Sequence, residues 1–135
     1  MNIFVNGTFD VLHPGHLDLL NYAKSLGDFL LVAIDSDQRV ASKKGLDRPL
    51  NPQQNRKVLL ENLRAVDAVE VFNSDQELTN LVKTFSPDIM IVGSDYQNKT
   101  VIGSEHAREL RFYNRSTPHS STQIIEHFTN RRCMR

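Results

Sequence analysis

The sequence lacks the features that mark proteins outside the ordinary globular class. Its 135 residues include no tryptophan and one cysteine, Cys133, which cannot form an internal disulfide and suits a reducing compartment. The formal net charge is zero, so the overall charge does not indicate a nucleic acid or an anionic membrane as partner. No apolar run approaches the roughly 20 residues that span a bilayer. The N-terminal MNIFVNG has neither the basic start nor the apolar stretch of a signal peptide. We therefore expect a cytoplasmic protein.

Two nucleotide-binding motifs are also missing. No G-x-G-x-x-G follows the first apolar run, which argues against a dinucleotide redox cofactor. No G-x-x-x-x-G-K-[ST] is present, which argues against a P-loop. The composition, with 39% hydrophobic and 24% charged residues, is that of a globular protein. Its length predicts a single domain over residues 1–135.

Short apolar runs alternate with stretches of helical periodicity along the chain. The alternation predicts βαβ units and an α/β class, as a three-layer Rossmann-like fold with a mainly parallel five-stranded sheet and helices on both faces. The polar segment 35–52 is expected to be a loop. The expected strands are 2–5, 29–34, 68–72, 88–92 and 109–114, and the expected helices are 14–26, 52–64, 76–85 and 120–130. Ligands of such sheets bind at the carboxyl ends of strands.

The segment GTFDVLHPGH follows the first expected strand directly. Pro14 suits the first turn of a helix, which places His13 and His16 at a helix N-terminus, where backbone N–H groups favour an anion. Imidazoles there can donate hydrogen bonds to phosphate oxygens in a transition state. Two alternatives stay open, an ordinary helix cap and a metal site built from Asp10, His13 and His16. The three residues lack the wider spacing of structural zinc ligands.

Further cations and hydroxyls are concentrated in two other segments. The polar segment ASKKGLDRPLNPQQNRKVL is rich in lysine and arginine, which could also be a solvated face; its cations are Lys43, Lys44, Arg48, Arg56 and Lys57. Near the C-terminus, RSTPHSST carries an arginine and three hydroxyls before the last expected helix, at Arg115, Ser120, Ser121 and Thr122. Ser120 could simply form a capping box with Gln123. The same groups could also hold phosphates.

Taken together, GTFDVLHPGH and RSTPHSST resemble the H-x-G-H signature and the R-x-x-x-x-S-T-T segment of the cytidylyltransferase-like nucleotidyltransferases. This sequence departs from the pattern at Ser121, where threonine is common, and at His119, where an apolar or aromatic residue is usual. The resemblance covers essentially the whole chain and implies a role for each matching residue. The implied catalytic residues are His13, His16, Lys44, Arg56 and Arg115. The implied nucleotide-binding residues are Gly7, Thr8, Phe9, Asp10, Gly15, Asp95, Ser120, Ser121 and Thr122.

The resemblance implies transfer of a nucleoside monophosphate from ATP or CTP to a sugar phosphate or polyol phosphate, with release of pyrophosphate. It also implies Mg²⁺ bound with the triphosphate, for which Asp10 is a possible ligand, and a homodimer. The patterns KG-x-x-RP-x-NP and G-x-DY-x-x-x-x-x-IGSE are closer to the heptose-1-phosphate adenylyltransferase group. Glycerol-3-phosphate cytidylyl transfer is the alternative, because stand-alone members of that kind exist. A nucleotide-binding module without catalysis is the alternative from another class.

Overall fold

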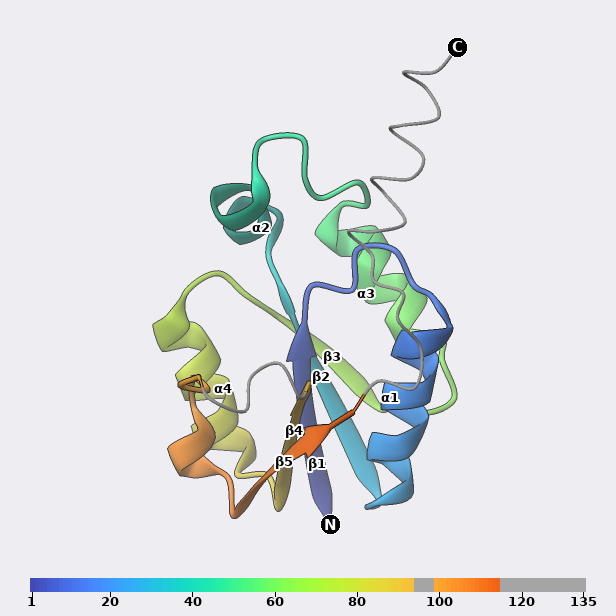
Figure 1. Ribbon diagram of the computed structural model, residues 1–135, viewed down its shortest axis with the longest axis vertical. Coiled ribbons are helices and arrows are strands. Elements are labelled where there is room, and N and C mark those ends of the chain that lie inside the picture. The colour runs from blue at the N-terminus through green and yellow to red at the C-terminus, as the bar shows by residue number, and fades with distance from the viewer. Residues whose placement is uncertain (94–98, 115–135) are drawn as a thin grey trace.

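The computed structural model describes residues 1–93 and 99–114, whose strands form one five-stranded sheet (Figure 1). The strand order is β3-β2-β1-β4-β5, and every neighbouring pair is parallel. The strands are β1 (Asn2–Gly7), β2 (Phe29–Asp35), β3 (Ala68–Phe72), β4 (Ile89–Gly93) and β5 (Glu109–Tyr113). The expected strands are confirmed to within about a residue or two at their ends, and the sheet is parallel throughout.

Helices cover both faces of this sheet. On one face, α1 (Pro14–Ser25) and α3 (Gln53–Glu61) pack against β1, β2 and β3; on the other, α4 (Asp75–Phe85) packs against β3 and against the short helix η2 (Ser104–His106) (Figure 1). The remaining helix, α2 (Asp37–Lys44), lies beyond the end of β2. The predicted α/β class with a Rossmann-like, three-layer architecture is therefore confirmed.

The alternation of side chains along each strand divides the core in two. In β1, Ile3 and Val5 belong to the cluster under α1 and α3, whereas Phe4 belongs to the cluster under α4. In β4, Ile91 belongs to the cluster under α1 and α3, and Met90 belongs to the cluster under α4. Strands buried on both faces read as continuous apolar runs, and each fully buried large side chain stabilises the fold by about 1.5–3 kcal/mol. This is why the strands were readable from the sequence.

Helix α2 lies in the segment that we expected to be a loop. Its N-cap Ser36 accepts a hydrogen bond from the backbone N–H of Arg39 at 3.1 Å, and the helix ends at Gly45, whose φ of 110° favours glycine. The buried residues of α2 are Arg39 and Val40. Because one of them is an arginine, the helix has no apolar stripe that a periodicity search could find. The expected helix 120–130 lies outside the described residues.

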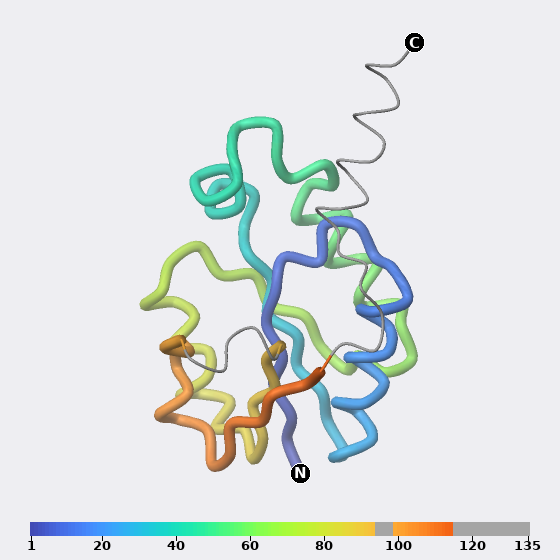
Figure 2. Tube along the Cα trace, in the orientation of Figure 1, coloured from blue at the N-terminus to red at the C-terminus, as the bar shows by residue number. Residues whose placement is uncertain are grey.

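The carboxyl ends of the strands gather the segments that matter for function. The loop after β1, helix α2 and the loop before α3 all lie at the end of the sheet opposite the N-terminus (Figure 2). The chain order also reverses between β1 and β4, where ligands of open α/β sheets bind. Across residues 1–93 and 99–114, the helices are all too short or too polar to cross a bilayer.

Candidate active site

The two histidines of GTFDVLHPGH form the N-terminal cap of α1. His13 is the N-cap residue, and its Nδ1 accepts a hydrogen bond from the backbone N–H of Gly15 at 3.1 Å. His16 reaches back so that its Nδ1 accepts from the backbone N–H of His13 at 3.3 Å. The two rings stack with centroids 3.8 Å apart. The sequence thus specifies a capping box in which imidazoles replace the usual hydroxyl and carboxylate.

These caps fix the tautomer of both rings. A backbone N–H can only donate, so each Nδ1 must present a lone pair. A neutral imidazole with an unprotonated Nδ1 carries its proton on Nε2. His13 and His16 are therefore both Nε2–H donors, and both line a cavity at the carboxyl ends of the strands. The arrangement suits hydrogen bonding to an anionic oxygen.

The cavity has a volume of about 390 Å³, within the range of small-molecule sites. Its lining combines the end of β1, the start of α1, the end of β2 and helix α2. It includes most of the expected site residues that the structure describes, namely Gly7, Thr8, Phe9, His13, Gly15, His16 and Lys44. Expected residues Asp95, Arg115, Ser120, Ser121 and Thr122 lie outside the described part of the chain. Their roles stay predictions.

Phe9 lines the cavity and packs against the ring of His16. Its backbone has a φ of 50°, an uncommon value for a bulky residue, and its ring lies 5.1 Å from that of His16. A Cβ added at Gly7 would stand 2.9 Å from the Phe9 ring. Glycine is therefore needed at position 7 to let the aromatic ring lie beneath His16.

Asp10 binds the backbone of the loop before α3. Its side chain is buried, and its two carboxylate oxygens accept hydrogen bonds from the backbone N–H groups of Leu50 and Asn51, each at 2.9 Å. The guanidinium of Arg48 lies 3.5 Å away. Asp10 is not among the residues that line the cavity. It ties the loop before α3 to the loop after β1, a geometry that does not favour contact with nucleotide or Mg²⁺.

Arg56, for which the family resemblance implies a phosphate contact, is bonded to other segments of the protein in this structure. It is only 1% exposed and does not line the cavity. Its guanidinium donates to the backbone oxygens of Asn51, Thr8 and Asp35 at 2.9, 2.9 and 2.8 Å, and to the carboxylate of Asp37 at 2.9 Å. These acceptors come from the ends of β1 and β2 and from the starts of α2 and α3. Arg56 thus joins the segments that surround the cavity.

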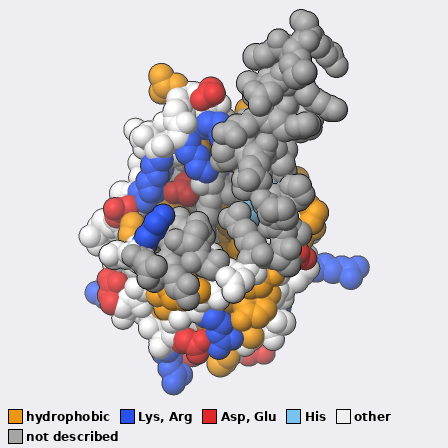
Figure 3. Space-filling model, in the orientation of Figure 1, with side chains coloured by type: hydrophobic (Ala, Val, Ile, Leu, Met, Phe, Trp, Pro, Cys, Tyr) orange, Lys and Arg blue, Asp and Glu red, His pale blue; other side chains and the backbone are white. Residues whose placement is uncertain are grey.

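Lys44 and Lys43 contribute positive charge from α2. Both line the cavity, although their outer surfaces are exposed. Partial burial lowers the pKa of the Lys44 ammonium group, and the nearby Arg48 lowers it further. Lysine and arginine side chains gather on the upper left of the face shown in Figure 3. An incoming phosphate would relieve the repulsion among these cations.

An ion-pair network that our sequence analysis did not find lies on the same side of the cavity. Arg39 donates from Nε to Asp35 at 2.8 Å and from Nη2 to Asp75, at the start of α4, at 2.6 Å. Its guanidinium lies 5.1 Å from the centroid of the Phe72 ring. Burial alone lowers the pKa of Arg39, but the hydrogen bonds to Asp75 and Asp35 outweigh it and raise the pKa. Asp35 and Arg39 both line the cavity.

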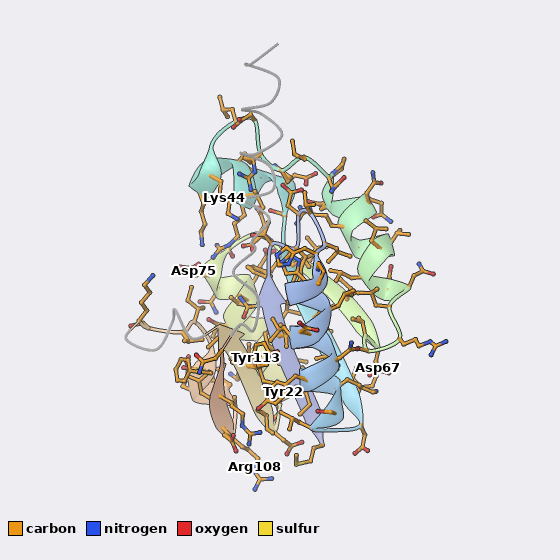
Figure 4. The ribbon with its side chains drawn as sticks, turned by 45° about the vertical axis from the view of Figure 1, so that its right-hand side comes forward. Tyr22, Lys44, Asp67, Asp75, Arg108 and Tyr113 are labelled. Carbon is orange, nitrogen blue, oxygen red and sulfur yellow. The ribbon has the colours of Figure 1, made fainter. Side chains whose placement is uncertain are left out.

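One wall of the cavity comes from the opposite edge of the sheet. Tyr113, the last residue of β5, lines the cavity and stacks on Tyr22 of α1 with ring centroids 4.9 Å apart (Figure 4). No group of three or more His, Cys, Asp or Glu side chains suited to a metal ion occurs in residues 1–93 and 99–114.

Comparison with known proteins points in the same direction. A family model described as cytidylyltransferase-like matches residues 4–127. Curated relatives named "Bifunctional protein HldE" are 46% identical in a Nitratiruptor species and 43% identical in Helicobacter hepaticus, each over 124 residues and 92% of this chain. The aligned part is 27% and 26% of those proteins, so the chain spans about a quarter of their length.

Solved structures support the fold. The structure titled as the lipopolysaccharide core biosynthesis protein from Thermoplasma volcanium GSS1 superimposes with a TM-score of 0.68 at 23% identity, covering 84% of this chain and 96% of that one. A protein of unknown function from Archaeoglobus fulgidus gives a TM-score of 0.63 at 18% identity, covering 89% and 96%. Similarity at this level of identity concerns the architecture alone.

Proposed function

The chain belongs to the cytidylyltransferase-like family of nucleotidyltransferases, and from this premise we propose that it transfers AMP from ATP to a heptose 1-phosphate, as an ADP-heptose-type adenylyltransferase. The observation that carries the proposal is the pair of Nε2–H donors on His13 and His16, which line a cavity that also holds Lys44. The identity of 43–46% to bifunctional HldE proteins supports the choice of substrates.

The proposed reaction is a single displacement at phosphorus. An oxygen of the acceptor phosphate attacks the α-phosphorus of the triphosphate, a new P–O bond forms, and the bond to the β-phosphate oxygen breaks with release of pyrophosphate. His13 and His16 donate hydrogen bonds to oxygens of the α-phosphate, where charge develops, while Lys44 offsets charge on both the α-phosphate of ATP and the acceptor. The nucleophile is the substrate itself, so no covalent intermediate on the protein is required.

Mg²⁺ enters this scheme as part of the substrate. It binds to the phosphates and to water with few protein ligands, and it neutralises phosphate charge. Asp10 fits this role poorly because it is only 1% exposed and is not among the residues that line the cavity. Asp95, Arg115 and the hydroxyls of residues 120–122 remain predicted contacts to the nucleotide.

Since nucleoside triphosphates are available in the cytoplasm, we propose that the reaction takes place there.

We also propose that the protein is a homodimer. Val58 and Leu59 on α3 are 46% and 50% exposed, and Leu50 in the preceding loop is 56% exposed. Exposed apolar side chains that are close in the fold are typical of protein interfaces. A molar mass near twice 15.4 kDa in sedimentation equilibrium would support the dimer, and a mass near 15.4 kDa at micromolar concentration would contradict it.

Pyrophosphate release provides the direct test of the proposed activity. The purified protein is assayed with ATP, CTP, GTP and UTP in turn, each with heptose 1-phosphate or glycerol 3-phosphate. We expect release with ATP and heptose 1-phosphate to exceed every other combination. Preference for CTP and glycerol 3-phosphate would assign the cytidylyl reaction. Binding of triphosphate without release for any pair would assign a non-catalytic module.

The lowered pKa of Lys44 predicts a pH dependence of ATP binding. Lys44 loses its proton as the pH rises through this lowered pKa, so the affinity for ATP should fall at a lower pH than for an ordinary lysine, whose pKa is about 10.4. The Lys44→Ala variant should bind about tenfold more weakly at pH 7, since a charge-assisted hydrogen bond is lost. It should also lose the alkaline decline. The affinity is measured by calorimetry between pH 7 and 10.

The matched control for this experiment is Lys43→Ala. Lys43 lies beside Lys44 on the same helix and lines the same cavity, so its replacement removes one neighbouring positive charge and leaves Lys44 in place. Its variant should keep the alkaline decline of the wild-type protein. Identical pH profiles of ATP binding for the wild type and Lys44→Ala would contradict the role given to Lys44.

The free energy of unfolding should also increase slightly as the pH rises towards the pKa of Lys44 in the unfolded chain, because the folded state binds that proton less tightly.

A further inference from the structure

The cavity extends well beyond the two histidines, towards the ends of β2 and β3. The proposed bond forms beside His13 and His16, so the acceptor phosphate must lie there. The remainder of the acceptor then has to occupy other parts of the cavity. One such part, at the end of β2 and along α2, is lined by Asp35 and Arg39. This inference rests on the proposed function and concerns the chemistry by which the acceptor is recognised.

Asp35 presents unused acceptor capacity to the cavity. It is the last residue of β2, and its side chain is 14% exposed. One carboxylate oxygen accepts from Arg39 Nε at 2.8 Å, and the other accepts from the Thr8 hydroxyl at 3.2 Å. A carboxylate has about four acceptor positions, so each oxygen can take a further hydrogen bond. An ionised carboxylate has no proton to donate, so its ligand must supply O–H or N–H groups.

Arg39 holds this carboxylate in place and compensates its charge. Its guanidinium is fixed between Asp35 and Asp75 and lies against the Phe72 ring. Arg39 is 9% exposed, so the pair is shielded from solvent and its geometry is well defined. A lone carboxylate would repel the phosphates that the cavity is proposed to bind. Paired with Arg39, Asp35 can accept hydroxyl hydrogens in a cavity that also takes anions.

These features define the chemical class of the acceptor. Phosphate oxygens would be drawn to the imidazole and lysine donors and kept away from the carboxylate of Asp35. Hydroxyl groups carried on the same molecule would be drawn to Asp35. We propose that Asp35 is a specificity-determining residue that accepts hydrogen bonds from hydroxyl groups of the acceptor, and that the acceptor is the phosphate ester of a polyhydroxylated sugar. Arg39 is the positioning residue that keeps Asp35 in the required orientation.

The test compares Asp35→Asn with Asp75→Asn by calorimetric titration. Asparagine keeps an oxygen that can accept from Arg39 but loses the charge and half of the acceptor capacity. Asp75 is the matched control because it contacts the same guanidinium but is not a lining residue of the cavity and is 67% exposed. The ligands are heptose 1-phosphate, mannose 1-phosphate, glycerol 3-phosphate, inorganic phosphate and ATP. Thermal unfolding verifies that both variants are folded.

For Asp35→Asn, we expect the affinity for heptose 1-phosphate and mannose 1-phosphate to fall about tenfold or more, as for loss of hydrogen bonds to a charged group. The affinity for glycerol 3-phosphate should fall less, because this ligand carries fewer hydroxyls. The affinities for inorganic phosphate and ATP should not change. Asp75→Asn should change every affinity by no more than about fivefold, since exposed ion pairs contribute little. In turnover, Asp35→Asn should raise KM for the sugar phosphate with KM for ATP unchanged.

Two results would overturn this inference. One is unchanged binding of both sugar phosphates by Asp35→Asn. The other is an equal loss for inorganic phosphate, ATP and sugar phosphates, which would mean that Asp35 only supports the structure. If Asp35→Asn unfolds, Asp35→Glu moves the carboxylate by one methylene and should alter the ranking of the acceptors; an unaltered ranking would contradict the proposal. Absence of pyrophosphate release by the wild type would instead refute the proposed activity, because the titrations do not depend on turnover.

Discussion

Replacing His16 with alanine should reduce the rate of pyrophosphate release by about 10²- to 10³-fold, the usual effect of deleting one donor to a developing charge. His16 lines the cavity, and its Nδ1 caps α1 through the backbone N–H of His13. The same variant should therefore lose about 1 kcal/mol of unfolding free energy, as for other lost caps. Steady-state kinetics and urea denaturation measure the two effects.

His16→Gln separates catalysis from capping. Glutamine at the third helical position can accept from the N-cap backbone N–H, as in an ordinary capping box, but it has no imidazole. We expect this variant to unfold at nearly the wild-type urea concentration and still lose most of its turnover. Wild-type rates in either variant would contradict the role given to His16. If His16→Gln recovered both properties, the histidine would be a cap alone.

Replacing Arg56 with alanine should have the largest effect on stability in the described part of the chain. Its guanidinium is fully buried and donates to Asn51, Thr8, Asp35 and Asp37. Removing it leaves three backbone carbonyl oxygens without these donors and the partly exposed Asp37 carboxylate without its ion pair, which costs about 3–5 kcal/mol. This is a large share of the roughly 5–15 kcal/mol that is typical of a domain. We expect a large shift of the urea midpoint, with loss of activity that follows the loss of folded protein.

Arg56→Lys and Arg108→Ala complete this experiment. Lysine keeps the charge but cannot satisfy acceptors spread over four chain segments, so Arg56→Lys should be intermediate in stability. Arg108 is 82% exposed and paired with Asp88, and its replacement should cost at most about 1 kcal/mol. If Arg56→Ala had a wild-type midpoint and only its turnover fell, Arg56 would contact phosphate directly, as the family resemblance implied.

The sequence predicted the sheet well because its strands are buried on both faces. Runs such as FLLVAI and DIMIV have almost no polar residue that could face solvent, and this excludes most alternatives to a central parallel strand. Helix α2 was missed because its buried residues include Arg39, so burial and hydrophobicity did not coincide. The periodicity of a helix is readable only where the buried side chains are apolar.

The site was predicted in part. The expectation that His13 and His16 lie at a helix N-terminus agrees with the structure, because Pro14 and the helical period mark that position. Asp35 and Arg39 were not found, although Asp35 directly follows a predicted strand and could have been suspected on that ground alone. The burial of Arg56 could not be predicted, because a sequence does not distinguish an arginine that faces a cavity from one that is buried among carbonyl groups.

What the sequence determined by itself was the set of local features: which runs are strands, where α1 begins, and which segments carry imidazoles, cations and hydroxyls. Those features depend on neighbours within a few residues, through periodicity, capping and turn preferences. Only the tertiary structure decided how the cations are used. Lys44 and Arg56 lie in similar polar surroundings along the chain, yet one lines the cavity and the other is bonded to four chain segments. That difference depends on contacts between β1, β2, α2 and α3, which exist only once the sheet has assembled.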